Sequence, residues 1–183
     1  MSLNNPYATG FGRIPAHFIG RDLLIDEILE ELYSDPVQGQ AYKLTGIRGT
    51  GKTVTLTAIE RRLKEDKTWI VTGVKPEGNI TEDLVSNLYN EVPLLSDYFK
   101  SSLNLSKFGI GLNISGTAPV SSLDSALRKI VKEISKRGKR LLVTVDEVKN
   151  TPEMRNFVQE FQLLIRQDMP IYLIVAGLYN DIV

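Results

Sequence analysis

Glycines, a lysine and a threonine stand over residues 46–53 at a spacing that suits phosphate binding. The stretch reads GIRGTGKT and matches the pattern G-x-x-x-x-G-K-[ST]. Glycines let backbone N–H groups turn toward an anion, because they tolerate positive φ and carry no Cβ. Lys52 would place a charge on the β- and γ-phosphates, and the Thr53 hydroxyl would coordinate Mg²⁺. The residues expected to bind a nucleotide here are Gly46, Ile47, Arg48, Gly49, Thr50, Gly51, Lys52, Thr53 and Val54.

Two carboxylates, Asp146 and Glu147, directly follow the apolar run 141–145. Taken alone, this pattern is equally typical of a strand that ends in solvent. Together with an upstream phosphate loop it indicates a site at the carboxyl end of a parallel strand, where ligands bind in α/β sheets. Asp146 would then join Thr53 in holding Mg²⁺, and Glu147 would orient or deprotonate the attacking water. We therefore expect Glu147 and Lys52 to be the catalytic residues.

The nucleotide is predicted to be ATP, bound with Mg²⁺. A glutamate beside the aspartate resembles the ATPases that carry a catalytic glutamate, which kinases and small GTPases usually lack. The chain also has no N/T-K-x-D motif of the kind that reads guanine.

Strand and helix patterns alternate around these motifs. Strands are expected over 41–45, 69–74, 141–145 and 171–176, and helices over 22–33 and 53–64 and from caps at Thr81, 121–124 and Thr151. Central strands that are apolar on both faces indicate a mostly parallel sheet with helices on each side. The predicted fold is the three-layer α/β sandwich of P-loop NTPases.

Residues 96–120 fit this scheme poorly. Phe108, Ile110, Leu112 and Ile114 alternate with smaller or polar residues, which is the periodicity of a strand. The segment is expected to be a hairpin or extended insertion, and otherwise a loop.

The composition excludes several classes of protein. The 183 residues include 22 basic and 22 acidic side chains, so no net field recruits nucleic acid or a membrane surface. With no cysteine and one histidine, disulfides, thiolate catalysis and Cys/His metal clusters are excluded. The sequence shows neither a membrane-spanning apolar run nor a signal peptide, and the cytoplasm is the expected location.

The N-terminal segments 5–15 (NPYATGFGRIP) and 18–22 (FIGRD) resemble the N-terminal box of bacterial AAA+ ATPases, which are similar to archaeal and origin-recognition-type ATPases and to STAND ATPases. This resemblance implies that Phe18, Ile19 and Gly20 lie near adenine. The alternative is that they only pack at the entry to the first helix. At 176–178 the chain has Ala-Gly-Leu, where many AAA+ proteins carry a polar sensor residue.

The resemblance also implies a domain organisation and a function. Residues 1–183 would form one ATPase core with an irregular arm over 1–20, and a helical lid and later domains would lie beyond this chain. ATP hydrolysis would drive a conformational cycle. The alternatives are a STAND-like switch with little turnover and the ATPase part of a DNA-associated protein. A homo-oligomer or DNA could be bound through the further regions.

Overall fold

The protein has a central sheet of four parallel strands. The computed structural model describes residues 22–111 and 120–178. The strands are β1 (Ala41–Thr45), β2 (Trp69–Val74), β3 (Arg140–Val148) and β4 (Ile171–Gly177). Their order across the sheet is β1-β4-β3-β2, and each neighbouring pair is parallel. This arrangement confirms the predicted α/β sandwich with a parallel sheet.

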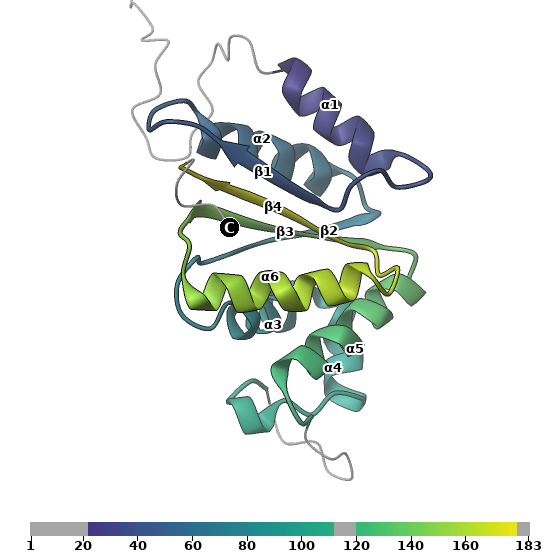
Figure 1. Ribbon diagram of the computed structural model, residues 1–183. Coiled ribbons are helices and arrows are strands. Elements are labelled where there is room, and N and C mark those ends of the chain that lie inside the picture. The colour runs from purple at the N-terminus through teal and green to yellow at the C-terminus, as the bar shows by residue number, and fades with distance from the viewer. Residues whose placement is uncertain (1–21, 112–119, 179–183) are drawn as a thin grey trace, which may run out of the picture.

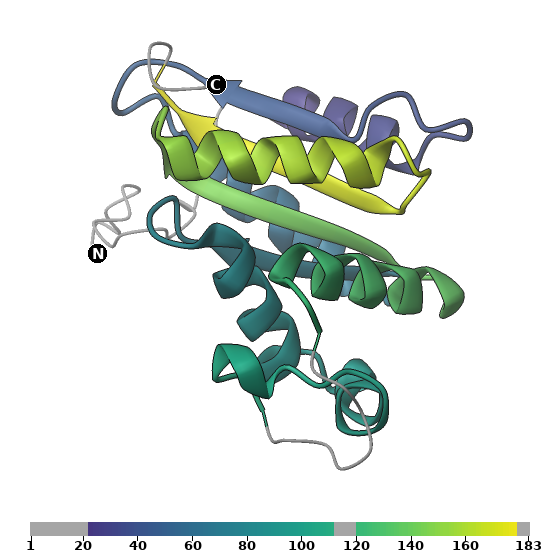
Figure 2. The same cartoon turned by 60° about the horizontal axis from the view of Figure 1, so that its bottom comes forward.

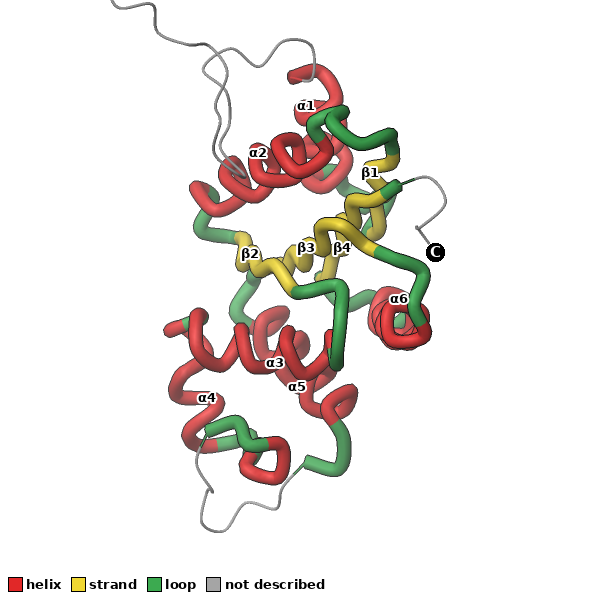
Figure 3. The backbone as a smooth tube through the Cα atoms, turned by 90° about the vertical axis from the view of Figure 1, so that its left-hand side faces the viewer, coloured by secondary structure: helices red, strands yellow, loops and turns green. Residues whose placement is uncertain are grey.

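Helices cover both faces of the sheet (Figures 1 and 3). On one face lie α1 (Asp22–Tyr33) and α2 (Lys52–Glu65), and on the other lie α3 (Ile80–Glu91), α5 (Leu123–Lys136) and α6 (Pro152–Ile165). The chain crosses from β1 to the far edge at β2 and then returns one strand at a time. Crossovers between parallel strands are right-handed. The helix that connects β1 to β2 and the helices of the returning connections therefore lie on opposite faces of the sheet.

Each face of the sheet packs into its own hydrophobic core. In β3 the side chains of Leu141, Val143 and Val145 join the core with α3, α5 and α6, whereas Leu142 joins the core with α1 and α2. Successive residues of a strand point to opposite faces, so a strand between two helical layers is apolar at most positions, and the buried polar residue of β3 is Thr144.

Side-chain caps begin three of the helices. Ser122 accepts a 3.1 Å hydrogen bond from Ser125 N at the start of α5, and Thr151 accepts one of 3.2 Å from Met154 N at the start of α6. The cap at Thr151 was expected, and the capping box expected over 121–124 is found as a cap at Ser122 alone. The prediction that Thr81 caps α3 is wrong, because Asn79 fills that position and accepts from Glu82 N. Thr81 lies instead within the first turn.

Residues 96–101 and 106–108 are helical, and the residues between and after them form turns with one isolated bridge at Asn104. A hairpin or extended segment is therefore wrong for 96–111, and the alternative of a loop fits only the residues outside the helical turns. The 3₁₀ turn Pro93–Leu95 leads into α4 (Ser96–Ser101), and a second 3₁₀ turn spans Ser106–Phe108. Figure 2 shows this region on the far side of α3 and α5 from the sheet.

Tertiary packing explains the difference. Phe99 is buried, with its ring centroid 5.0 Å from that of Tyr89 on α3. Gly109 and Gly111, which the strand pattern placed at outward positions, both have φ of +70° and turn the chain. Residues 112–119 of the predicted insertion and the predicted arm over 1–20 lie outside the described residues. Within the described parts, no helix is long and apolar enough to cross a membrane.

Candidate functional site

The glycine-rich loop joins the end of β1 to the start of α2. Gly49 and Gly51 have φ of +83° and +77°, in the left-handed region that side chains rarely adopt. At Gly46 an added Cβ would lie 2.7 Å from the Thr50 hydroxyl oxygen, closer than such atoms approach. The path of the loop therefore favours glycine at 49 and 51 by its positive φ, and at 46 a side chain would have to displace the Thr50 hydroxyl.

Lys52 is the first residue of α2, and its side chain folds back over the loop. Its Nζ donates 2.9 Å hydrogen bonds to the carbonyl oxygens of Gly46 and Ile47. The N-terminus of α2 has no side-chain cap, and its first turn contains no acidic residue. The free N–H groups, the helix dipole and the ammonium thus all favour a bound anion.

A β-bulge places both carboxylates at the end of β3. Val145 pairs with Val175 of β4 and Val148 pairs with Gly177, so β3 contains one more residue than its partner over this interval. Glu147 has φ of +52°, in the left-handed region. Val145 and Val148 both join the core beneath α3, α5 and α6. Asp146 and Glu147, which lie between them, are not part of that core. In a regular strand, Asp146 and Glu147 would point to opposite faces.

The phosphate loop and the acidic strand end line one cavity of about 460 Å³. Its walls come from the loop, the first turn of α2, the ends of β3 and β4 and the residues that follow them. The lining residues are Arg48, Gly49, Gly51, Lys52, Thr53, Val54, Asp146, Glu147, Val148, Lys149, Gly177 and Leu178. The carboxyl ends of parallel strands meet at one edge of the sheet, so these segments converge there.

The donor set of this cavity fits Mg²⁺. Thr53 offers a hydroxyl that has no hydrogen-bond partner among the described residues, and Asp146 offers a carboxylate whose Oδ1 accepts a 2.9 Å bond from Glu147 N. Both are hard oxygen ligands. Within 22–111 and 120–178 no cluster of three or more His, Cys, Asp or Glu residues could hold a metal. Mg²⁺ commonly takes one or two protein ligands and completes its shell with water and phosphate.

Most of the predicted site residues meet in this cavity. Gly46, Ile47 and Thr50 belong to the loop but do not line it: Ile47 is 70% exposed, and Thr50 Oγ1 donates a 2.9 Å bond to the Ile47 carbonyl. Phe18, Ile19 and Gly20, predicted to contact adenine, lie outside the described residues.

A sequence profile of the AAA ATPase domain family matches residues 17–175. The chain belongs to the AAA ATPase domain family. The match includes the loop at 46–53 and the acidic strand end, and it confirms the predicted resemblance. No curated protein sequence matches this AAA ATPase domain.

Solved structures with the same fold include two archaeal proteins. Cdc6p from Pyrobaculum aerophilum superposes with a TM-score of 0.57 at 17% identity over 92% of this AAA ATPase domain. The Orc1 protein of Aeropyrum pernix, solved in complex with DNA, superposes with a TM-score of 0.52, also at 17% identity and 92% coverage. The domain spans 41% of the length of each of these proteins. At this identity the likeness extends to the fold.

Four cavity residues of this AAA ATPase domain were not predicted as site residues: Val148, Lys149, Gly177 and Leu178. Lys149 Nζ lies 3.2 Å from Oε1 of Glu77, which follows β2. The Lys149 ammonium thus forms an ion pair with a residue beyond the neighbouring strand, and Lys149 lines the same cavity as Asp146 and Glu147. The sequence places Lys149 two residues after Glu147, but the extension of β3 through the bulge is what turns that segment into a wall of the site.

Proposed function

We propose that this domain binds Mg·ATP and hydrolyses it to ADP and phosphate, driving a conformational cycle. One observation carries the proposal: a single cavity brings together the glycine-rich loop, Lys52, Thr53 and two adjacent carboxylates. These are the groups that phosphoryl transfer to water requires, because its catalysis consists mainly of positioning and charge neutralisation.

In this mechanism the loop N–H groups and Lys52 hold the β- and γ-phosphates. On nucleotide binding, Lys52 Nζ would exchange its two carbonyl acceptors for phosphate oxygens. Thr53 and Asp146 would hold Mg²⁺, which neutralises charge on the phosphate oxygens when bound. Glu147 would orient a water molecule for in-line attack and accept its proton.

The base is proposed to be adenine, with Phe18, Ile19 and Gly20 beside it. The contacts of Phe18, Ile19 and Gly20 depend on the resemblance of the N-terminal box alone. The choice of adenine itself is also supported by the adjacent Asp146 and Glu147 and by the lack of an N/T-K-x-D motif. A larger stabilisation by GTP than by ATP would contradict it.

Binding is tested by thermal unfolding of the chain with Mg·ATP. At about 100 times Kd, linkage gives about 2.7 kcal/mol of stabilisation, or about 5–10 °C for a domain of this size. Lys52→Ala should remove most of this shift, because the loop loses its ammonium. Lys64→Ala, at the opposite end of the same helix, is the matched control and should keep the shift. If Lys52→Ala also keeps it in full, the phosphates bind elsewhere.

A second candidate is a nucleotide-dependent switch that binds ATP or ADP tightly and turns over little. The end of β4 favours it: Ala176 is buried and Gly177 lines the cavity, so that strand offers no polar side chain toward the phosphates. Steady-state hydrolysis by the wild-type chain separates the two candidates. Tight binding with turnover that Glu147→Gln does not change would favour the switch.

A further inference from the structure

Basic residues cluster along one helix, although the net charge of the chain is zero. Residues 128–140, which run from within α5 into β3, contain seven basic residues and one acidic residue, Glu133. None of the seven lines the nucleotide cavity, and the proposed ATPase mechanism uses none of them. The balanced total therefore conceals a strong local segregation of charge.

The solvent-exposed side of α5 is cationic along its length. Its opposite side is buried in the core shared with α3 and α6. Lys129, Lys132 and Lys136 are exposed, and their i, i+3, i+7 spacing aligns them over about 10 Å of the helix. Ser125 and Ser135 lie on the same side of the helix and add hydroxyl donors to it.

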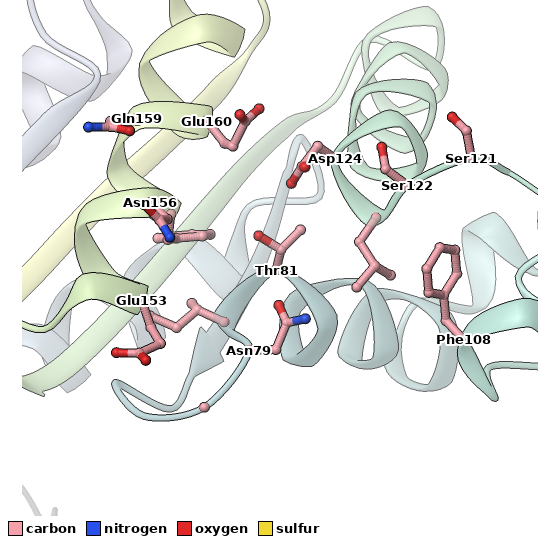
Figure 4. Close-up of a pocket in the computed structure, with 14 residues that line it drawn as sticks. Asn79, Thr81, Phe108, Ser121, Ser122, Asp124, Glu153, Asn156, Gln159 and Glu160 are labelled. Carbon is pink, nitrogen blue, oxygen red and sulfur yellow. The ribbon is translucent and has the colours of Figure 1, made fainter.

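Carboxylates do not neutralise this side. Glu133 is 17% exposed, and its Oε1 lies 2.9 Å from Nε of Arg137, so its charge is already paired. Figure 4 shows Asp124 directed from the first turn of α5 toward α6. The three exposed lysines form no hydrogen bond or ion pair within 22–111 and 120–178. Their ammonium groups are available to an external anion.

The helix dipole accounts for only part of this charge. A cation near the C-terminus of a helix is stabilising, and Lys136 and Arg137 are placed for that role. Lys129 and Lys132 lie before the last turn, where this effect has fallen off. Arg128 is a further sign, because its buried Nε has no hydrogen-bond partner within the described parts of the chain. The donors of this guanidinium are thus not used by the fold.

The cationic surface continues past the end of α5. Lys139 Nζ donates a hydrogen bond to the carbonyl of Lys67, which precedes β2 and is itself exposed. These two lysines lie at the amino ends of β2 and β3, whereas the nucleotide cavity lies at the carboxyl ends of the strands. The surface is therefore separate from the nucleotide site.

An array of unpaired cations fits a partner with closely spaced negative charges. Duplex DNA carries about one phosphate charge per 1.7 Å, so the 10 Å covered by the lysines corresponds to about six charges. A helix that binds membranes presents its apolar side to lipid, but the apolar side of α5 is in the core. Single strands and RNA are recognised largely through aromatic stacking or 2′-hydroxyl contacts, and α5 has no aromatic residue.

We propose that the exposed side of α5 binds the phosphate backbone of double-stranded DNA. Arg128, Lys129, Lys132 and Lys136 pair with phosphates along the duplex, and the two serine hydroxyls donate to phosphate oxygens. Contacts of this kind position a duplex without reading its bases. The binding is therefore independent of base sequence.

The proposal is tested by fluorescence anisotropy of a labelled duplex of about 20 base pairs, titrated with the chain at about 50 mM salt and above. Binding should be micromolar at low salt, and four phosphate contacts predict a slope of about −4 for the logarithm of the binding constant against that of the salt concentration. Duplexes of unrelated sequence should bind within about twofold of each other. Absence of binding, or binding that does not respond to salt, would overturn the proposal.

Matched variants locate the surface. Lys129→Gln/Lys132→Gln should weaken binding about tenfold and make the salt slope less negative by about two. Arg61→Gln/Lys64→Gln removes the same charge from exposed residues of α2, on the other face of the sheet (Figure 3), and should bind within about twofold of the wild type. Lys129→Arg/Lys132→Arg keeps the charge and should retain binding.

Thermal unfolding of each variant separates loss of binding from loss of fold. Wild-type affinity in the α5 glutamine variant, or an equal loss in the α2 variant, would contradict the assignment of the surface. Competition with duplex RNA, phosphatidylserine vesicles and polyglutamate tests the class of partner. At equal concentration of negative charge, none should displace the labelled duplex better than unlabelled duplex DNA. Better displacement by one of them would assign the surface to that class and overturn the proposal.

Discussion

The hydroxyl of Thr144 in β3 donates a 2.5 Å hydrogen bond to Oε1 of Glu60 in α2. Thr144 is 2% exposed, and the residue two positions later in β3 is Asp146. This bond joins the helix that begins with Lys52 to the strand that ends in the carboxylates. It therefore fixes the spacing between the two halves of the candidate nucleotide site.

Replacing Thr144 by valine should lower the free energy of unfolding by about 1–3 kcal/mol, because the Glu60 carboxylate loses its buried donor. Urea denaturation measures the change. Thr144→Ser keeps the hydroxyl and should lose less stability than valine. A valine variant as stable as the wild type would show that the bond contributes nothing.

Glu147→Gln should keep Mg·ATP binding and slow single-turnover hydrolysis by about 10²–10⁴-fold, since the amide keeps the size of the side chain but cannot accept the proton. Rapid-quench measurement of phosphate release gives the rate. Glu82→Gln, an exposed carboxylate in the first turn of α3, is the control and should hydrolyse at the wild-type rate. Unchanged hydrolysis by Glu147→Gln would remove Glu147 from the mechanism.

Glu147→Gly should be more stable than Glu147→Ala by about 1 kcal/mol, because only glycine adopts the observed φ of +52° without cost. Both variants lack the carboxylate, so the comparison isolates the backbone. Thermal unfolding of the two variants side by side provides the measurement. Equal stability would mean that the positive φ at this bulge carries no strain.

Asp146→Asn should weaken the magnesium-dependent part of nucleotide binding, because the amide is a poorer ligand for a hard cation. The quantity to measure is the ratio of ATP dissociation constants in magnesium and in EDTA. This ratio should fall toward one in the variant, while the affinity in EDTA stays near that of the wild type. A ratio equal to that of the wild type would place Mg²⁺ away from Asp146.

Tyr33 and Asp66 should titrate as a linked pair. Tyr33 Oη donates a 2.6 Å bond to Asp66 Oδ2, which together with bonds from Thr68 lowers the pKa of Asp66, while partial burial and this bond raise the pKa of Tyr33 to about 12. The stability that Asp66 contributes is present above its unfolded pKa and is lost as pH falls through the lower folded pKa. The contribution of Tyr33 is present below its unfolded pKa and is lost as pH rises through about 12.

Tyr33→Phe should therefore move the pKa of Asp66 upward, toward that of a free aspartate. NMR titration of the Asp66 carboxyl carbon measures this shift. An unchanged pKa for Asp66 would show that the hydrogen bond from Tyr33 is not its main cause.

The sequence by itself determined the parallel sheet, the phosphate loop, the cap at Thr151 and the presence of a cap within 121–124. These features depend on local rules: strands buried on both faces are mostly apolar, a tight loop around phosphate needs glycine, and a helix start needs an acceptor at its first N–H groups. Each rule involves a few consecutive residues, so the order of residues is sufficient to predict it.

Only the tertiary structure decided the geometry of Glu147, the helical turns at 96–101 and 106–108 and the walls of the nucleotide cavity. Alternation along a regular strand would send Asp146 and Glu147 to opposite faces, and the bulge that prevents this depends on how β3 pairs with β4. Residues 108–111 alternate as a strand would, yet Gly109 and Gly111 have positive φ and turn the chain. Nearby, Phe99 packs against Tyr89. Thr81 changed from a predicted cap to a residue of the first turn because the cap of α3 lies two residues earlier than its pattern indicated, at Asn79. These local conformations depend on contacts between residues far apart in the chain. The free energy of those contacts outweighs the local preferences that the sequence pattern shows.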